Sequence, residues 1–216
     1  MAVKELILKF RIKIGHEIRN LPIILELRYF RLIICMAINS GRIRSLRQGP
    51  VDFQGRPVPW LTPASISFIA SLDLSNYRMI EFGAGHSTLW FSSRVHQITS
   101  YECDLEWIRL LEFKFNYSGN INLVENNYGA EDLNFENSEI VLIDGLDRSR
   151  IVQSILKQLP RNRSLELLLI DNPEFIDSNI LRKLDRQFTR IDFKGLPNNA
   201  WNETTTSIFI RKSQVQ

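Results

Sequence analysis

Polar side chains stand at or near the ends of the most apolar stretches of this sequence. Residues 79–82, 98–102, 139–145 and 165–172 each read as a short buried strand that runs into an acid or an amide. The carboxyl ends of parallel strands meet at one edge of a sheet, so we expect these groups to lie together. Carboxylates there can accept ribose hydroxyls, and two of them with an amide oxygen can bind a divalent cation. The residues are Glu81, Glu102, Asp144, Asp171 and Asn172.

A glycine turn follows the first of these strands. The apolar residues 79–82 run directly into Gly83-Ala84-Gly85, and helical spacing begins at His86. Gly83 lets the chain turn tightly, and Gly85 removes a side chain where a ligand must approach the backbone. Free N–H groups at the helix start favour polar or anionic ligand atoms. Strand, turn, helix and a second strand ending in an acid form the first half of a nucleotide-binding βαβ unit.

The residues of this turn separate it from a dinucleotide fingerprint. A G-x-G-x-x-G motif needs glycine at position 88, which is Thr88. The pattern of Glu81, Gly83 and Gly85, with Glu102 at the end of the second strand, resembles class I S-adenosylmethionine (SAM)-dependent methyltransferases. The strings IEFGAGHSTLWFSSRV and SYECDLEW are similar to a subgroup of small bacterial members. The resemblance covers residues 60 to 212, and it departs from the family where a frequent third glycine is replaced by His86-Ser87.

The resemblance implies SAM as the cofactor and a methyl transfer to oxygen or nitrogen of a small-molecule or glycan-like acceptor. It places Asp144, Arg148 and His86 as candidate catalytic residues. The segment PWLTPASISFIASL resembles what precedes the first strand in the subgroup, so we expect it beside the cofactor pocket. Candidate cofactor-binding residues are Glu81, Gly83, Ala84, Gly85, Ser87, Glu102, Cys103 and Asp144.

Three further features bear on the site. Asp144, Asp171 and Asn172 resemble the metal triad of catechol-type O-methyltransferases, which would hold Mg²⁺. The lysine base of those enzymes is missing, and Arg148 in that neighbourhood stays protonated. The alternative is that Asp144 contacts substrate or loop N–H groups while Asp171-Asn172 cap the next turn. Two adenine contacts are also open: Trp107 can face the ring or the core, and Glu131 and Asp132 fall where the family often places a carboxylate.

Strands and helices alternate through the rest of the chain. The last two strand-like stretches, RIDFKGL and TTTSIFIRK, face each other across residues 197–201, as an antiparallel pair would. We therefore predict an α/β fold, a doubly wound, mostly parallel seven-stranded Rossmann-like sheet with an N-terminal helical appendage. The predicted parts are a basic helical segment (residues 1–47), a connector rich in glycine and proline (48–62) and the SAM-binding domain (63–216).

Composition sets the class of protein. The 216 residues are 44% apolar and 24% charged, which is ordinary for a globular chain. Residues 1–50 hold ten Lys or Arg against three acids, a net of +7, so the total of +3 leaves −4 for residues 51–216. That balance gives no electrostatic footprint for nucleic acid, and we expect none as a partner. Cys35 and Cys103 suggest neither a disulfide framework nor a zinc site, and a cytoplasmic protein is expected.

The N-terminal segment allows two roles. Residues 1–20 carry an apolar stripe at helical spacing, and residues 21–38 are more apolar still. Glu26, Arg28 and Arg31 interrupt them, so we predict no transmembrane span. The helices either cover the domain or pair two subunits, or they make a peripheral contact with a membrane surface. The functional alternative to an enzyme is a non-catalytic methyltransferase-like module, tethered to a membrane or partner through residues 1–47.

Overall fold

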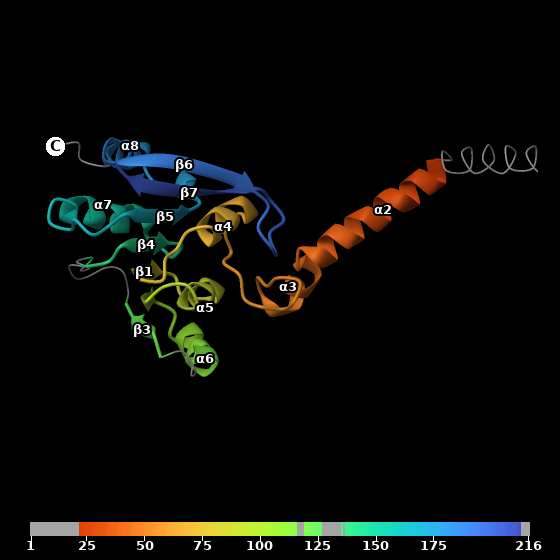
Figure 1. Cartoon of the computed structure of the whole chain (residues 1–216), viewed down its shortest axis with the longest axis horizontal. Helices are drawn as coiled ribbons and strands as arrows, with labels where there is room; N and C mark the ends of the chain where they lie inside the picture. Colours follow the sequence, from red (N-terminus) through yellow and green to blue (C-terminus); the bar gives the residue numbers. More distant parts are fainter. Residues whose placement is uncertain (1–21, 116–118, 127–134, 136, 213–216) are drawn as a thin grey trace, which may run out of the picture.

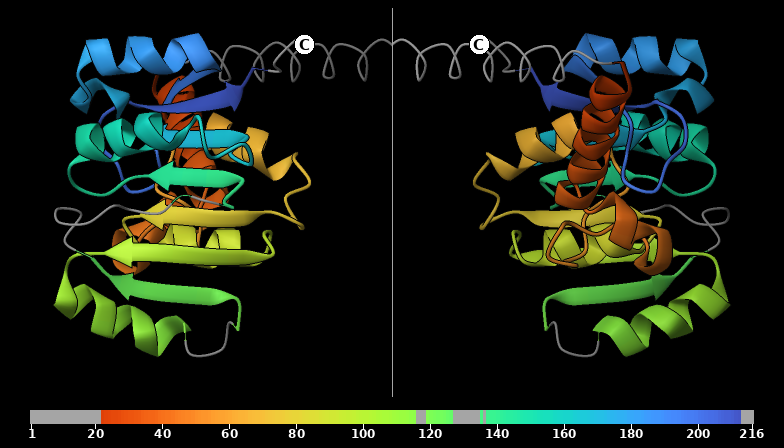
Figure 2. Two further views of the ribbon diagram at one scale, coloured as in Figure 1. Left: turned by 90° about the vertical axis from the view of Figure 1, so that its left-hand side faces the viewer. Right: turned by 90° about the vertical axis from the view of Figure 1, so that its right-hand side faces the viewer.

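The structure, a computed structural model, describes residues 22–115, 119–126, 135 and 137–212. Its centre is a seven-stranded sheet in the order β3-β2-β1-β4-β5-β7-β6. Strands β1 to β5 are parallel, and β7 is antiparallel to both of its neighbours. Figure 2 shows the strands stacked from β3 in green to the β6–β7 pair in blue. The predicted fold class and the antiparallel final pair are confirmed.

The helices and strands have the following bounds. The strands are β1 (Arg78–Phe82), β2 (Gln97–Glu102), β3 (Ile121–Glu125), β4 (Ile140–Ile143), β5 (Leu167–Asp171), β6 (Phe188–Gly195) and β7 (Thr204–Arg211). The helices are α2 (Pro22–Asn39), α3 (Arg42–Gln48), α4 (Pro63–Ala70), α5 (His86–Ser92), α6 (Leu105–Phe115), α7 (Arg148–Gln158), the 3-10 helix η1 (Pro173–Phe175) and α8 (Ser178–Gln187).

Helices cover both faces of the sheet, in keeping with the apolar residues of β4 and of β5 up to its final Asp171. Successive side chains of a strand point to opposite faces, so Met79 and Ile80 enter different cores. Ile80 packs in the cluster that contains the apolar residues of α7 and α8. Met79 packs in the cluster that contains those of α4 and α5. All residues of β4 and β5 are buried as a result.

Helix α2 extends away from the sheet, as Figure 1 shows. Its large apolar side chains are exposed: Phe30 and Leu27 are each 63% exposed and Met36 is 62% exposed. The arrangement in which the N-terminal helices cover the domain therefore does not hold for α2. The apolar stripe expected over residues 1–20 lies outside the described residues. In the part of the chain that is described, no helix has both the length and the apolar character needed to cross a membrane.

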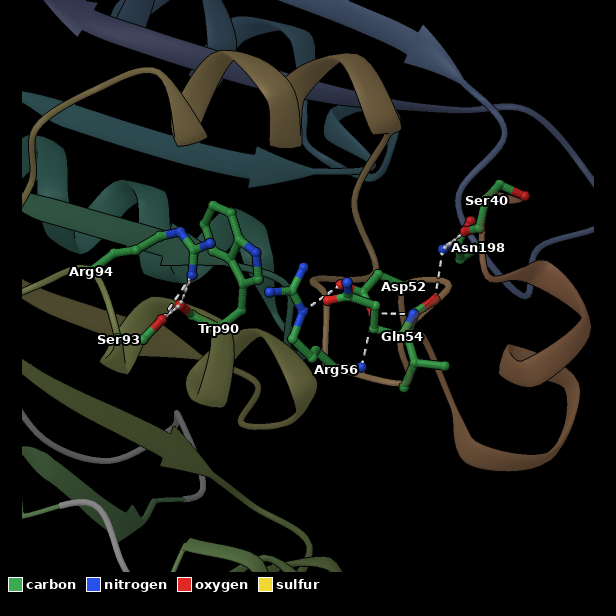
Figure 3. Close-up of polar contacts among 9 residues, drawn as sticks. Ser40, Asp52, Gln54, Arg56, Trp90, Ser93, Arg94 and Asn198 are labelled. Atoms are coloured by element: carbon green, nitrogen blue, oxygen red, sulfur yellow. Dashed lines mark hydrogen bonds and ion pairs between the residues drawn. The ribbon is translucent and has the colours of Figure 1, made fainter. Parts of the chain in front are cut away.

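Helix α3 and the connector, in contrast, are tied to the domain. The buried Ser45 hydroxyl donates to Gly41 O at 2.9 Å and accepts from the Val51 N–H at 3.0 Å. Asn198, in the loop between β6 and β7, donates to Ser40 O at 2.9 Å and to Val51 O at 3.0 Å. The Asp52 carboxylate closes a small turn of the connector by accepting from Gln54, and from the Arg56 side chain at 2.7 Å (Figure 3). These bonds fix residues 40–58 beside the carboxyl edge of the sheet.

Candidate functional site

A cavity of about 270 Å³ opens beyond the carboxyl ends of β1 and β4. One wall is the glycine turn with the start of α5, and a second is formed by Asp144 after β4 and Trp107 of α6. The connector and the β6–β7 loop close the remaining side. The lining residues are Gly49, Pro50, Trp60, Gly83, Ala84, Gly85, His86, Ser87, Trp107, Asp144 and Asn199.

The two glycines of the turn have different tasks. Gly83 has a φ of +97°, and a Cβ there would lie 2.8 Å from the Gly145 N atom. A side chain at that position would therefore strain the backbone and collide with the chain after β4. At Gly85 a Cβ would meet no atom within 4 Å. Gly85 borders the open cavity, so it leaves space for a ligand rather than for another part of the protein.

Glu102 ties the end of β2 to the glycine turn. Its Oε2 atom accepts from the Ala84 N–H at 3.1 Å, and its Oε1 atom accepts from the N–H groups of Cys103 (2.7 Å) and Asp104 (3.0 Å). A carboxylate offers about four acceptor positions, so one remains for a ligand hydroxyl. Glu102 is 8% exposed, and Ala84, which donates to it, lines the cavity. Its contact with a ribose remains a prediction, as does any role for the neighbouring Cys103.

Glu81 is fully buried beneath the turn. Its Oε2 atom accepts from the Thr88 hydroxyl at 2.5 Å and from the Ser100 hydroxyl at 2.6 Å, and Thr88 in turn accepts from the Gly85 N–H at 2.9 Å. Its Oε1 atom has no hydrogen-bond partner among the described residues. Burial raises the pKa of Glu81 to about 7, against the opposing effect of the surrounding hydroxyls. Thr88, which excluded a dinucleotide fingerprint, thus connects Glu81 to the turn.

Arg148 joins the acids at the ends of β4 and β5. Its Nη2 atom donates to Asp144 O at 3.0 Å and to Asp144 Oδ1 at 3.3 Å, and its Nε donates to Asp171 O at 2.9 Å. Burial and the charge of Asp171 raise the pKa of Asp144 well above its ordinary range, although Arg148 opposes the shift. Burial likewise raises the pKa of Asp171 to about 6, against a 2.8 Å hydrogen bond from Thr206.

These residues do not fit the expected magnesium site. The guanidinium of Arg148 already supplies a cation between Asp144 and Asp171, and Thr206 takes one oxygen of Asp171. Asn172 has a φ of 51° and precedes η1, where its carbonyl accepts from the Phe175 N–H at 3.1 Å. Within the described ranges, no three His, Cys, Asp or Glu residues form a group that could hold a metal ion. The arrangement matches the alternative in which residue 172 caps a turn.

His86 fastens the connector to the start of α5. Its Nε2 atom lies 3.0 Å from Gln48 O, and a Cβ at Gly49 would lie 2.6 Å from its Cε1 atom. Because a carbonyl only accepts, Nε2 carries the proton in this contact. The ring lines the cavity. A catalytic role for His86 remains a prediction.

Aromatic residues complete the cavity. Trp107 donates from Nε1 to Ala84 O at 2.8 Å, and its half-buried ring both lines the cavity and packs against the small core cluster of Ala84 and Leu111. Trp60 lines the same cavity, in agreement with the expectation that the segment beginning PWLTP lies beside the pocket. Asn199 was not anticipated, because its position depends on how the β6–β7 loop folds back onto the connector. Glu131 and Asp132 lie outside the described residues.

Comparisons with known proteins identify the fold. No protein-family model matches the sequence, and no curated protein matches it significantly. Among solved structures, a putative tRNA (m1A22) methyltransferase of Streptococcus pneumoniae, in complex with SAM, is similar with a TM-score of 0.52 and 11% identity, over 72% of this chain and 76% of that one. An rRNA methylase of Streptococcus thermophilus has a TM-score of 0.51 and 13% identity, and the match spans 68% of this chain and 94% of that one. A dimethyladenosine transferase of Plasmodium falciparum has a TM-score of 0.52 and 13% identity, and the match spans 72% of this chain but only 64% of that one.

These neighbours correct one expectation. The charge balance of residues 51–216 led us to expect no nucleic acid, yet the structures named above include an rRNA methylase and a putative tRNA methyltransferase. Proteins of this fold thus include RNA methyltransferases, so the exclusion of nucleic acid is wrong. Taken together, the strand order, the glycine turn and these structures show that the chain has the fold of class I SAM-dependent methyltransferases.

Proposed function

We propose that the protein is a SAM-dependent methyltransferase that acts on an oxygen or nitrogen of its acceptor. The observation that carries the proposal is the cavity itself. It joins the glycine turn, Trp107 and Asp144 at the carboxyl edge of the sheet, where an open α/β sheet binds its ligands. The open space at Gly85 supports the proposal, since a cofactor needs room against that backbone.

Residues on this edge have the groups that SAM requires. The remaining acceptor position of Glu102 suits a ribose hydroxyl, and the ring of Trp107 offers an apolar surface for the adenine. When bound, SAM supplies a methyl group on a positively charged sulfur, which leaves as a neutral thioether. The main task of the protein is then to align the acceptor atom with that methyl group.

In this proposal Asp144 takes the acceptor proton. It lies on the cavity wall, and its raised pKa makes the carboxylate a stronger base than an ordinary aspartate. An acceptor O–H or N–H would transfer its proton to an Asp144 oxygen as the oxygen or nitrogen gains the methyl group. Arg148 holds Asp144 in place through its bonds to the side chain and the backbone of that residue.

The acceptor that we propose presents a single hydroxyl or amine to a narrow site. We propose a small-molecule or glycan-like acceptor whose reacting group enters the cavity, in the part that Trp60 and Asn199 help to line. The solved structures of RNA methyltransferases make RNA acceptors part of the same screen.

An acceptor screen that records S-adenosylhomocysteine release tests the proposal. Asp144→Asn should lower turnover at least tenfold while the dissociation constant of SAM stays within about twofold, since the lost group acts on the proton. Asp147→Asn is the matched control, because Asp147 is exposed and three residues further along the chain. Equal losses in both variants would contradict the role of Asp144. SAM binding without any methylated product across sugars, amines and RNA would favour a non-catalytic module.

A further inference from the structure

A second, apolar cavity lies beside the cofactor cavity. It is a groove of about 310 Å³ between the α2–α3 corner and the β6–β7 loop. Apolar side chains form most of its lining, and Trp201 on its rim is 89% exposed. The lining includes Ala37, Ile43, Leu46, Leu196, Ala200 and Trp201.

Hydrogen bonds between its two walls fix the shape of this groove. Arg42 of α3 donates from Nη2 to Leu196 O, across the groove from helix to loop. Asn198 donates to Ser40 O at 2.9 Å, so the same loop is held a second time (Figure 3). Gly41 allows the close approach, because a Cβ there would lie 2.3 Å from Val51 O. The groove is therefore formed before any ligand arrives.

The groove runs into the cofactor cavity. Asn199 lines both spaces, so the groove and the cavity are neighbours that meet at this residue. In the other direction the apolar surface continues along α2, where Ile33 is 49% exposed and Met36 is 62% exposed. The groove thus lies between the exposed apolar side chains of α2 and the cavity in which the methyl group would be transferred.

We propose that this groove binds the hydrocarbon chain of an amphiphilic methyl acceptor, whose hydroxyl- or amine-bearing head enters the cofactor cavity past Asn199. The inference rests on the proposed methyltransferase function and specifies its substrate class. Six of the eight lining residues are apolar, so a sugar or a nucleotide in the groove would find polar partners only at Arg42, which already donates to Leu196 O, and at Asn199; its other polar groups would be left without partners, which is unfavourable. A hydrocarbon chain there has no polar groups that would lose hydrogen bonds to water, and it removes the apolar surface of Leu46 and Trp201 from water.

A series of alkyl glucosides tests the proposal on the full chain. Hexyl, octyl and decyl β-D-glucoside, each below its micelle concentration, are titrated calorimetrically in the presence of S-adenosylhomocysteine. We expect the dissociation constant to fall about fourfold for each added methylene, the value for transfer of a methylene out of water. Leu46→Asp should abolish this dependence on chain length. Leu27→Asp is the matched control, since both leucines are 63% exposed but only Leu46 lines the groove.

Each outcome decides between separate claims. Dissociation constants that do not change with chain length would overturn the inference, and SAM binding by the same protein would leave the methyltransferase proposal standing. Chain-length dependence without SAM binding would keep the groove and reject the methyltransferase. A dimer in sedimentation that Leu46→Asp converts to monomer would assign the groove to a second copy and overturn the inference. Binding of an oligoribonucleotide that Leu46→Asp alone abolishes would overturn it as well.

Discussion

Glu81 gives the fold a pH dependence that can be predicted in sign and size. The side chain is fully buried, and burial raises its pKa from 4.5 to about 7. A carboxyl group whose pKa is higher in the folded state binds its proton more tightly there. Its contribution to stability is therefore complete below pH 4.5 and is lost as the pH rises through 7.

The size of the effect follows from the shift. A shift from 4.5 to about 7 corresponds to roughly 3 kcal/mol, and about 2–3 kcal/mol of it falls between pH 5 and pH 8. A domain is stable by only about 5–15 kcal/mol, so a change of this size is readily measured. The group responsible should be the carboxylate whose Oε1 atom lacks a partner among the described residues.

Glu81→Gln isolates this contribution. The amide oxygen can still accept from the hydroxyls of Thr88 and Ser100, but the side chain no longer titrates. Between pH 5 and pH 8 the free energy of unfolding, from urea titrations, should fall by about 2–3 kcal/mol less in the variant than in the wild type. Asp144 and Asp171 also have raised pKa values and contribute with the same sign in both proteins. Parallel pH profiles of the two proteins would refute the reasoning.

Three further predictions concern the turn, the acids and the N-terminal helices. Gly83→Ala should lower the free energy of unfolding by about 1–3 kcal/mol, because the φ of Gly83 is +97°. Gly85→Val should fold normally but fail to bind SAM in a titration, because its side chain would fill the open space at Gly85. Equal losses of stability in the two variants would contradict the structural role of Gly83 and the ligand-binding role of Gly85. Arg148→Ala should shift the pH–rate profile to higher pH, because it removes the cation that lowers the pKa of Asp144. A profile that does not shift would exclude Asp144 as the titrating base. A chain beginning at Gln48 should aggregate, because it lacks α3, which is hydrogen-bonded to the β6–β7 loop. A chain that lacks only the exposed α2 should remain monomeric in sedimentation. A monomeric first chain and an aggregated second one would contradict the docking of α3 on the domain.

The strands of the sheet could be predicted from the sequence because each is marked by residues within the strand itself or directly beside it. The runs that became β4 and β5 are apolar on both faces, which is typical of strands covered by helices on each side. The glycine turn and its acids were also local, since Gly83 and Gly85 act within a few residues of β1. Their joint position followed from the rule for parallel strands.

The parts that could not be predicted depend on contacts between distant segments. The apolar residues of α2 suggested that this helix packs against the domain. Its exposure depends on the path of the chain between α2 and the sheet, which the residues of α2 do not determine. Asn199 enters the cavity only because Asn198 bonds to Ser40 and Val51, far away in the sequence. The expected metal triad has the right residue types, but nothing in the spacing of Asp144 and Asp171 shows that Arg148 lies between them.

Calorimetric titration with SAM and with NADH tests the central claim most directly. We predict that the wild-type protein binds SAM and not NADH. Glu102→Gln should raise the dissociation constant of SAM about tenfold, because a charge-assisted hydrogen bond of roughly 1.5 kcal/mol is weakened. Glu125→Gln is the matched control, since Glu125 pairs with Glu102 in register at the end of β3 and is exposed. A wild-type protein that binds NADH and fails to bind SAM would contradict the account.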